Sequence, residues 1–417
     1  MTKEAKSNVP KLRFPGFTDD WEQRKFSELV ELRRGLTYKP SDICEEGVRV
    51  LRSSNINEDS FAMGKDDVFV KKEAINIPYA QSGDILITSA NGSSRLVGKH
   101  TIIDGISDNS TVHGGFMLLA SAKNPQFVNA LMGSAWYSKF INIYVAGGNG
   151  AIGNLSKSDL EEQIVWAPSE PEQHRIGVFF EMLNEDITLH QRKLDQIKEY
   201  KKGLLQKMFP KDGEKVPEIR FPGFTGDWEQ CQLSEIYQSI SNAFVGTASP
   251  YYVEDGHFYL ESNNVKDGQI NYNSQIFIND EFYEKQKDKW LHTGDMVMVQ
   301  SGHVGHAAVI PEELDNTAAH ALIMFKNPKT IIEPYFLNFQ YQTEKAKKKI
   351  ENITTGNTIK HILASDMQEF VVDVTSWEEQ AKIAYLFRKL DNLITLHQLK
   401  LEKMKEYKKG ILQQMFV

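Results

Sequence analysis

The sequence predicts a mixed α/β protein with two pseudo-symmetric domains, each a small mixed sheet with helices, joined by two long helices that form an antiparallel coiled coil. Two repeats predict this fold class. Pro10 returns as Pro217 and Ser169 returns as Ser376, so an opening segment and a long helical stretch both recur at an offset of 207 residues. Short apolar runs typical of strands lie between them in each copy. The chain is therefore a tandem duplication and not a solenoid of many short repeats.

The two long helical stretches, 169–209 and 376–416, each begin with Ser-x-x-Glu, the pattern of a capping box. The capping residues are Ser169 with Glu172 and Ser376 with Glu379. Apolar residues then recur at alternating steps of four and three, the spacing of a coiled-coil seam. The predicted seam consists of Ile176, Phe180, Leu183, Ile187, Leu194 and Ile197 in the first copy and Ile383, Phe387, Leu390, Ile394, Leu401 and Met404 in the second. We expect the two stretches to pack on each other as a rigid internal spacer.

Polar residues interrupt both copies of the seam at matching positions, His190 and Lys201 in the first and His397 and Lys408 in the second. In one interpretation these side chains flank the seam and either extend to solvent or pair with a nearby acid, which sets the register. In the other they contact a partner along the helices. A glycine near the end of each stretch either permits close approach of the other helix or marks a frayed end. The two glycines are Gly203 and Gly410.

The repeats divide the chain into four predicted parts: a first domain over 1–168, a helix and linker over 169–216, a second domain over 217–375 and a second helix over 376–417. In the first domain we expect strands at 48–52, 84–88, 115–119 and 163–166 and a helix at 125–144. In the second we expect strands at 257–260, 295–300, 321–325 and 370–374 and a helix at 333–352. The polar loops after the matching strands differ in sequence, so the framework repeats while the loop chemistry diverges.

Composition excludes several classes of protein. The net charge of −8 argues mildly against a generic nucleic-acid binder, although a basic surface can be local. The two cysteines, Cys44 and Cys231, are too few for a disulfide framework or a structural zinc site, which fits a reducing compartment. No apolar run approaches the ~18 residues of a membrane helix, and the first residues lack the apolar core of a signal peptide. We therefore expect a cytoplasmic protein with no membrane partner.

Two pairs of longer strings carry a resemblance to a known family. Phe-Pro-Gly-Phe-Thr-x-x-Trp-Glu stands at 14–22 and 221–229, and Lys-x-Tyr-Lys-Lys-Gly-x-Leu-Gln-x-Met-Phe stands at 198–209 and 405–416. With two dissimilar domains and two near-identical helices, the chain resembles the specificity (S) subunit of type I restriction-modification systems over essentially its whole length. The resemblance implies two target-recognition domains, each reading one half of a bipartite, asymmetric site in double-stranded DNA, with the helices setting the spacing.

The resemblance also implies partners. Two methyltransferase (M) subunits and the restriction and translocation (R) subunits would assemble around the chain, and S-adenosylmethionine, ATP and Mg would be bound by those partners. We therefore expect no catalytic, cofactor-binding or metal-binding residues in this chain. Two other interpretations stay open. One is a DNA-binding or anti-restriction module that acts without methyltransferase partners. The other is a stand-alone DNA methyltransferase, against which the missing cofactor motifs weigh.

Candidate DNA contacts are polar and basic residues in loops and at strand ends, because short polar groups reach base edges and cations reach phosphates. In the first domain they are Arg33, Arg34, Lys39, Arg52, Asn91, Ser93, Ser94, Arg95, Lys99, Asn149 and Asn154. In the second domain they are Gln300, Ser301, His303, His306, Asn357 and Lys360. We expect Arg33, Arg34 and Lys39 to lie in a loop. Base readout is expected from Asn91, Ser93, Ser94 and Arg95 and from Gln300, Ser301 and His303.

Three motifs have both a chemical and a plain interpretation. Gly-Asn-Gly-Ala-Ile-Gly at 148–153 matches a dinucleotide-binding fingerprint, but no clear helix follows and no acidic residue ends a second strand ~20 positions on, which favours a loop. Asn-Pro-Gln-Phe at 124–127 is similar to an adenine-methyltransferase signature but lacks its second proline, which favours a turn before a helix. His303, His306 and His320 are a candidate metal cluster, but no cysteine is near, which favours a loop that is solvated or hydrogen-bonds DNA.

Overall fold

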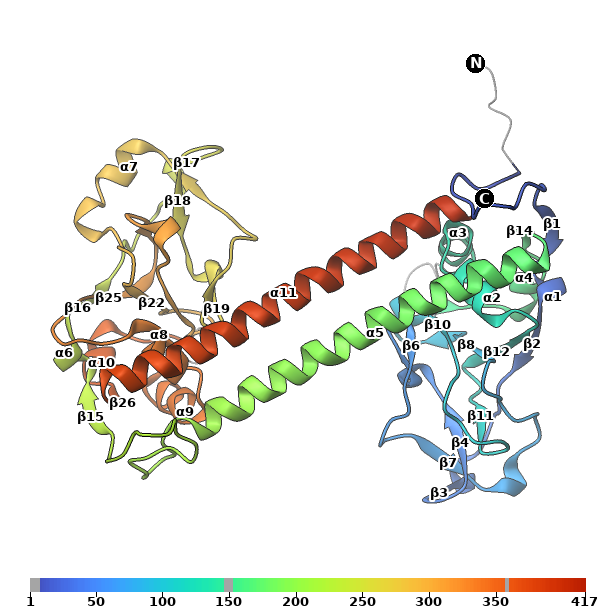
Figure 1. Cartoon of the computed structure of the whole chain (residues 1–417), viewed down its shortest axis with the longest axis horizontal. Helices are drawn as coiled ribbons and strands as arrows, with labels where there is room; N and C mark the ends of the chain where they lie inside the picture. The colour runs from blue at the N-terminus through green and yellow to red at the C-terminus, as the bar shows by residue number, and fades with distance from the viewer. Residues whose placement is uncertain (1–7, 146–152, 357–359) are drawn as a thin grey trace, which may run out of the picture. The chain divides into compact units, whose positions relative to one another are not determined.

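The structure is a computed structural model that describes residues 8–145, 153–356 and 360–417. The chain divides into two compact units (Figure 1), Met1–Lys193 with Gln398–Val417 and Leu194–His397. Two long helices, α5 (Glu170–Lys207) and α11 (Trp377–Met415), contribute residues to both units. Each unit also contains its own sheets and shorter helices, so the predicted mixed α/β class with two repeated domains is confirmed.

The described residues of the first unit form two four-stranded sheets and several shorter ladders. One is antiparallel with the order β10-β8-β12-β2, and the other has the order β11-β4-β7-β3 with β11 and β4 parallel. Three two-stranded ladders pair β1 with β14, β9 with β13, and β5 with β6. The strands are β1 Glu22–Lys25, β2 Val30–Arg34, β3 Ile43–Cys44, β4 Val48–Leu51, β5 Ile56–Asn57, β6 Ser60–Phe61, β7 Val68–Val70, β8 Ile85–Thr88, β9 Ala90–Asn91, β10 His100–Ile102, β11 Thr111–His113, β12 Met117–Ala122, β13 Gly153–Asn154 and β14 Ile164–Ala167. The shorter helices are α1 Phe26–Leu29, α2 Pro125–Met132, α3 Ala135–Tyr144 and α4 Lys157–Glu161, with 3-10 turns η1 Pro40–Asp42, η2 Ser53–Asn55, η3 Lys72–Ala74 and η4 Ser94–Leu96.

The second unit repeats this plan. Its sheets have the orders β16-β25-β22-β23 and β17-β21-β18-β24, with β18 and β24 parallel, and two ladders pair β15 with β26 and β19 with β20. The strands are β15 Glu229–Gln232, β16 Tyr237–Asn242, β17 Tyr252–Val253, β18 His257–Leu260, β19 Val265–Lys266, β20 Gln269–Ile270, β21 Phe277–Ile278, β22 Met296–Val299, β23 Ala307–Val309, β24 Ala318–Ala319, β25 Leu322–Pro328 and β26 Val371–Val374. The shorter helices are α6 Leu233–Ile236, α7 Asp280–Glu284, α8 Pro334–Gln340, α9 Glu344–Ile353 and α10 Ala364–Gln368, with 3-10 turns η5 Ser249–Tyr251, η6 Ser262–Asn264, η7 Lys287–Lys289 and η8 Glu312–Leu314.

The strands β8 and β22 lie between two apolar clusters in their units, which is why all four residues of each are buried. In β22, Met296 and Met298 join the cluster beneath the helices, whereas Val297 and Val299 join a second cluster on the other face of the sheet. Successive side chains of a strand point to opposite faces, so a strand covered on both sides reads as a continuous apolar run.

The predicted strands are all present, with ends that shift by at most three residues, and the strand predicted at 257–260 matches β18 at both ends. The two predicted single helices, 125–144 and 333–352, are wrong, because each region forms two helices. Ser134 precedes α3, and its hydroxyl donates to the Leu131 carbonyl at 2.7 Å. Thr343 precedes α9 and accepts a hydrogen bond from the Ala346 amide at 3.2 Å. A hydroxyl residue that bonds the main chain ends one helix and starts the next, which an apolar pattern does not reveal.

In each unit the repeated opening segment packs against the end of a long helix. Trp21 is 2% exposed and packs edge-on against Phe416 with ring centroids 6.0 Å apart, and Trp228 packs the same way against Phe209 at 5.9 Å. The main chain repeats this relationship: the Leu12 amide donates to the Gln414 carbonyl at 2.9 Å, and the Ile219 amide donates to the Lys207 carbonyl at 2.8 Å. The end of α11 thus meets the first opening segment as the end of α5 meets the second.

Within each unit the start of one long helix lies beside the end of the other, the antiparallel sense. In the first unit the rings of Phe180 and Phe416 are 6.0 Å apart, and in the second those of Phe387 and Phe209 are 6.2 Å apart. Among the predicted seam residues, six are buried and six are half-buried. The buried ones are Ile176, Phe180, Leu194, Ile383, Phe387 and Leu401, and the half-buried ones are Leu183, Ile187, Ile197, Leu390, Ile394 and Met404.

Both seam lysines pair with an acid, as one interpretation expected, but only the pair formed by Lys201 joins the two long helices. Lys201 Nζ donates to Asp391 Oδ1 at 2.6 Å within the second unit, and Lys408 Nζ donates to Asp59 Oδ2 at 2.6 Å within the first. A Cβ atom added to Gly203 or Gly410 would meet no described atom within 4 Å, so close packing does not require these glycines.

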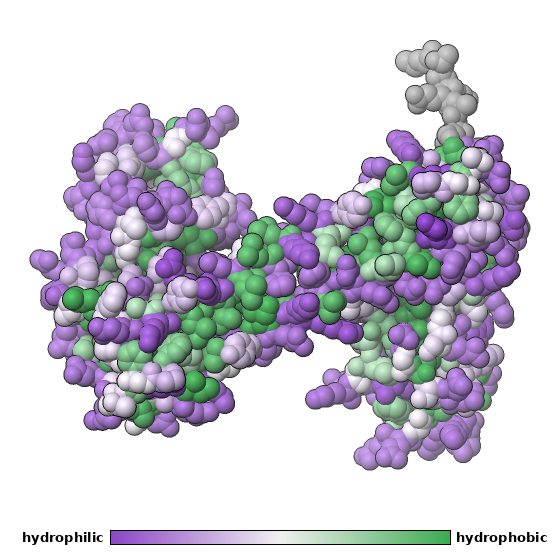
Figure 2. Space-filling model, viewed as in Figure 1, coloured by the Kyte–Doolittle hydropathy of each residue, from purple (hydrophilic) through white to green (hydrophobic). Residues whose placement is uncertain are grey.

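The capping boxes form only in part. The Glu379 amide donates to Ser376 Oγ at 3.4 Å, as predicted, but the carboxylates of Glu172 and Glu379 each accept two hydrogen bonds from an arginine of the opening segment. On the face shown in Figure 2, hydrophilic residues cover most of each unit. No helix in the described ranges is long and apolar enough to cross a membrane.

Candidate nucleic-acid interface

In the first unit two polar segments far apart in sequence form one surface. The β8–β10 loop (89–99) begins with β9, which pairs with β13, so that Asn91 lies opposite Gly153 and Ala90 opposite Asn154. Asn91 also accepts a hydrogen bond from the Ser93 amide at 2.9 Å, which shapes the turn that follows. Ser94, Arg95 and Asn154 are exposed, and Asn91, Ser93 and Lys99 are half-buried. The structure therefore brings these six candidates together.

The second unit repeats the arrangement with other side chains. The β22–β23 loop (300–306) lies beside the segment that ends at His361: Ser301 pairs with His361, and the Gly302 amide donates to the Lys360 carbonyl at 3.0 Å. His303 is exposed, Ser301 and His306 are half-buried, and Gln300 is 6% exposed. The buried Gln300 Oε1 has no hydrogen-bond partner among the described residues.

Each loop contacts a 3-10 turn of its own unit, and the two turns occupy equivalent positions. Asn91 Nδ2 donates to Ser53 Oγ in η2 at 2.9 Å, and His303 Nε2 donates to the Ser262 carbonyl in η6 at 3.1 Å. The turns themselves are built alike, because Asn55 and Asn264 are buried and each accepts a main-chain hydrogen bond from the residue three positions before it. The loops thus rest on a rigid repeated support while their own side chains differ.

The remaining basic candidates of the first unit lie elsewhere. Arg33 and Arg34 belong to β2, so their predicted loop placement is wrong. Arg33 Nη2 donates to Asp84 Oδ2 and to Ser121 Oγ, both at 2.9 Å, so its guanidinium already holds the sheet together. Arg34 is an exposed strand residue, and β2 is at the opposite edge of the sheet from β10.

Lys39 and Arg52 flank the smaller sheet. Lys39 is exposed just before η1, and its amide donates to Asp42 Oδ2 at 2.7 Å. Arg52 follows β4, and its Nη2 donates to the Asp66 carbonyl at 2.8 Å. Because Ser53 holds the β8–β10 loop, Arg52 is adjacent to that loop's support, whereas Lys39 is not. Asn149 and Asn357 are outside the described residues.

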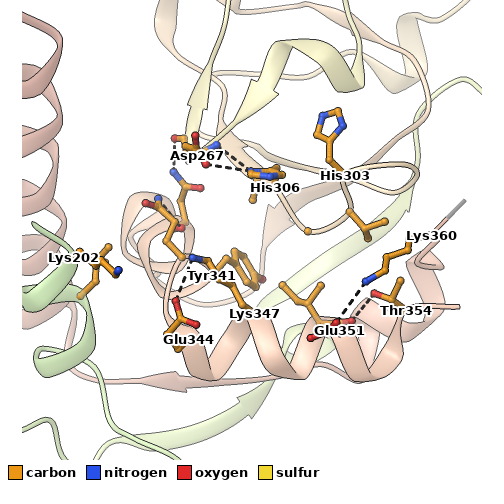
Figure 3. A pocket seen from close by; sticks show the side chains of 18 of the residues that line it. Lys202, Asp267, His303, His306, Tyr341, Glu344, Lys347, Glu351, Thr354 and Lys360 are labelled. Carbon is orange, nitrogen blue, oxygen red and sulfur yellow. Dashed lines mark hydrogen bonds and ion pairs between the residues drawn. The ribbon is translucent and has the colours of Figure 1, made fainter. Parts of the chain in front are cut away.

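A groove of about 490 Å³ in the second unit contains several of the candidates (Figure 3). It is lined by His303, His306, Lys347 and Lys360, and also by Lys202 and Asp267, which the sequence interpretation missed. Asp267 begins an Asp-Gly pair between β19 and β20, a standard hairpin signal that could have located this wall. Lys360 Nζ lies 3.5 Å from Glu351, and Lys347 Nζ lies 3.5 Å from Glu344.

The histidines make hydrogen bonds with their surroundings. His320 Nδ1 lies 3.1 Å from Glu261 Oε1, and this hydrogen bond raises the pKa of His320. His303 bonds the Ser262 carbonyl, and His306 bonds the Asp267 amide. Across 8–145, 153–356 and 360–417, no group of three or more His, Cys, Asp or Glu side chains is arranged to hold a metal ion.

The other two motifs have the following places. The fingerprint-like stretch at 148–153 lies outside the described residues except for Gly153, which is in β13. Asn124 is the residue before α2, and its Nδ2 donates to Gln173 Oε1 at 3.2 Å. Residues 125–127 form the first turn of α2, so the interpretation of 124–127 as the entry to a helix is confirmed.

Two units with the same framework, each presenting the same pair of polar loops with different side chains, define a two-domain recognition protein. The chain belongs to the family of type I restriction modification DNA specificity domains, which it matches twice, over 18–199 and 225–406. It is thus a specificity subunit of a type I restriction-modification system, with two recognition domains.

Two curated relatives from Methanocaldococcus jannaschii are similar. The chain is 24% identical over 419 residues to the putative type I restriction enzyme MjaX specificity subunit, covering 97% of this chain and 95% of that protein. It is 22% identical over 271 residues to the type I restriction enzyme MjaVIII specificity subunit, covering 63% of each.

Solved structures share the fold. The S subunit of a type I restriction-modification system from M. genitalium matches with a TM-score of 0.57 and 14% identity over 98% of this chain and 99% of that one. A chain from a study of complex assembly and conformational transition of the type I R-M system matches with a TM-score of 0.51 and 16% identity, covering 97% and 98%.

Proposed function

We propose that each unit reads one half of a bipartite, asymmetric site in double-stranded DNA and that α5 and α11 set the distance between the halves. The observation that carries this proposal is that the two units hold their loops with equivalent main-chain hydrogen bonds, while the side chains at these positions differ. The Thr88 amide bonds the Lys99 carbonyl in the first unit, and the Val299 amide bonds the His306 carbonyl in the second, both at 2.8 Å. A shared framework with divergent loop residues is what two readers of different sequences require.

Within this proposal the two loop surfaces hold the DNA contacts. In the first unit they are formed by Asn91, Ser93, Ser94, Arg95, Lys99 and Asn154, and in the second by Gln300, Ser301, His303, His306 and Lys360. Short polar side chains on a fixed loop discriminate base edges, and lysine and arginine bind phosphates. Arg33 is assigned to the fold instead, because a phosphate would have to compete with its buried Asp84 partner. Arg34, Lys39 and Arg52 remain candidates for backbone contacts.

Catalysis belongs to partners in this proposal. Two M subunits would supply methyl transfer with S-adenosylmethionine, and R subunits would supply ATP- and Mg-dependent translocation and cleavage. The chain alone, mixed with S-adenosylmethionine and DNA, should transfer no methyl group, and adding M subunits should restore transfer. Methyl transfer by the purified chain would instead support a stand-alone methyltransferase.

An exchange of one recognition domain tests the division of labour. Residues 30–165 would be replaced by the corresponding part of another specificity subunit, and the full chain would be expressed with its M subunits in a host whose methylated sites are then sequenced. We expect one half of the site to change while the other half and the gap stay constant. A change in both halves would refute independent reading.

An insertion tests the role of the helices. Fourteen residues, two heptads, would be added at matched points near the middle of α5 and α11, which lengthens each helix by about 21 Å while preserving its apolar stripe. We expect a longer gap between unchanged half-sites. An unaltered gap in a complex that still methylates would remove the spacer role.

A further inference from the structure

The groove of the second unit fixes the position of His306 from two sides (Figure 3). On one side Gly305 has a φ of +85°, and a Cβ there would lie 2.8 Å from Ile350 Cγ2 of α9. Only glycine combines that backbone with so close an approach. The loop therefore lies tightly against α9, and His306 is the next residue after this contact.

The other side is the hairpin between β19 and β20. Asp267 has a φ of +51° and Gly268 a φ of +84°, and a Cβ on Gly268 would lie 2.1 Å from Gln342 Nε2. The buried Asn338 donates from Nδ2 to the Gly268 carbonyl at 2.8 Å, which ties the hairpin to α8. The main chain of Asp267 is thereby held at a set place in the groove wall.

These two fixed segments determine which nitrogen of His306 carries the proton. The Asp267 amide donates to His306 Nδ1 at 3.1 Å. A main-chain amide can only donate, so Nδ1 must accept, and the proton of a neutral imidazole is then on Nε2. Burial lowers the pKa of His306, and His303, Lys266 and Lys347 lower it further against the Asp267 carboxylate, which favours the neutral ring at physiological pH.

Charges in the groove favour a base edge over a phosphate as the acceptor. Three lysines, Lys202, Lys347 and Lys360, line it together with three carboxylates, those of Asp267, Glu344 and Glu351. A phosphate site needs an excess of positive charge, which this balance does not provide. A polar, nearly neutral groove with a fixed donor matches an uncharged acceptor such as a purine N7.

The first unit has a donor at the same backbone position. Lys99 follows Gly98, whose φ is +83°, as His306 follows Gly305. A lysine ammonium donates and cannot accept. Both units thus present only a donor here, although the residue types differ.

We propose that His306 is a specificity-determining residue of the second unit, and that its Nε2–H donates to an acceptor on a base edge of the target half-site. This inference rests on the proposed function, since it assumes that the groove faces DNA. Asp267, Gly268 and Asn338 act as positioning residues, because they fix the tautomer without touching the base.

Two substitutions separate the ring's two nitrogens. In His306→Asn the side-chain oxygen can still accept from the Asp267 amide, but no donor reaches the Nε2 position. In His306→Gln the amide nitrogen can occupy that position and donate. Each variant of the full chain would be expressed with its M subunits, the methylated sites of the host sequenced, and the melting temperature of the complex recorded to show that it folds.

We expect His306→Asn to relax discrimination roughly 5- to 10-fold at one base pair of the second unit's half-site, the worth of about one hydrogen bond. His306→Gln should keep the wild-type preference, and the half-site of the first unit should not change in either variant. An unchanged site and rate in a folded His306→Asn complex would overturn the assignment.

A DNA probe provides a second measurement that does not depend on the variant's stability. Oligonucleotides carrying 7-deazapurines at the relaxed position lack the N7 acceptor, and the same site would also be measured with the other purine and pyrimidine acceptors removed singly. One such removal should weaken binding of the wild-type complex by a similar factor and leave His306→Asn unaffected. The residue is not a base reader if no single removal has this effect. The same conclusion follows if His306→Asn weakens binding to all DNA sequences equally and lowers the slope of binding against salt concentration by the amount of about one phosphate contact.

The proposed function can fail separately from this inference. A wild-type complex without a bipartite methylated site would refute the function and the inference together. A wild-type bipartite site that is indifferent to His306→Asn would refute the inference alone.

Discussion

Arg220 donates from Nε and Nη2 to the two carboxylate oxygens of Glu379, at 2.7 and 2.8 Å, and Glu379 is fully buried. The first unit holds the same pair, Arg13 with Glu172, at the same two distances. In each case an arginine of the opening segment binds a glutamate in the first turn of a long helix. The pair therefore fixes where the opening segment crosses the start of that helix.

Removing one partner of these pairs should be costly. Arg220→Met, or Arg13→Met in the first unit, leaves a buried carboxylate without its counter-charge, and we expect a loss of roughly 3–5 kcal/mol in the free energy of unfolding. Urea denaturation of the full chain measures it. Arg24→Met is the matched control, because its partner Glu22 is largely exposed, and its cost should be below about 0.5 kcal/mol. Equal effects of Arg13→Met and Arg24→Met would contradict a structural role for the buried pair.

The glycines near the ends of the long helices should be replaceable. A Cβ on Gly203 or Gly410 meets no described atom, so alanine should stabilise each helix by about 0.5–1 kcal/mol through its higher helix propensity. Gly177 is the control inside the same helix as Gly203: its Cβ would lie 2.8 Å from the Phe127 amide nitrogen, so alanine there should destabilise. Thermal unfolding of Gly203→Ala, Gly410→Ala and Gly177→Ala measures the change in stability, which should be a gain for the first two and a loss for the third. A destabilising Gly203→Ala would show that the glycine has a packing role after all.

The repeat and the apolar spacing were enough to predict two repeated domains and the long helices, because both features can be read from the order of residues along the chain. The pairing of Arg13 with Glu172 was not predictable in this way, since the glutamate's position suited a capping box equally well. The same holds for Arg33, whose basic side chain suggested a phosphate contact although Asp84 and Ser121 hold it.

The grouping of the candidate loops also depends on tertiary contacts. Nothing in the spacing of Asn91 and Asn154, 63 positions apart, indicates that β9 and β13 pair. The hairpin at Asp267 and Gly268 was readable from its Asp-Gly turn, but its contact with His306 was not. Side chains from distant segments meet only because a framework of buried strands brings their loops together.

The two seam lysines should differ in their contribution to stability. Lys201 and Asp391 are each 12% exposed, and burial raises the pKa of Asp391 against the effect of Lys201. Lys201→Met should therefore cost roughly 3 kcal/mol or more, and the double variant with Asp391→Leu should recover most of that loss. Lys408→Met should cost less than about 1 kcal/mol, because Asp59 is 73% exposed. Chemical denaturation of all four chains tests this, and equal costs for both lysines would contradict it.

His113 should make the first unit sensitive to acid. The ring is fully buried, its Nε2 donates to the Arg33 carbonyl at 3.2 Å, and burial lowers the pKa of His113 to about 4. Between pH 4 and 6.5 the unfolded chain binds a proton there that the folded chain does not, so stability is complete above about pH 6.5 and falls as the pH drops toward 4. The shift corresponds to roughly 3 kcal/mol. Hydrogen exchange of peptides covering 111–120, measured at several pH values, reports the stability of the first unit.

A non-titrating variant isolates the effect. His113→Gln keeps a donor for the Arg33 carbonyl, and although it should cost some stability at pH 7.5, the acid-dependent loss should largely disappear. His320→Gln is the control of opposite sign. The hydrogen bond to Glu261 raises the pKa of His320, so its contribution is present below about pH 6.5 and is lost as the pH rises through the raised pKa. That variant should leave the acid window untouched, and an acid dependence that persists in His113→Gln would place its origin in another group.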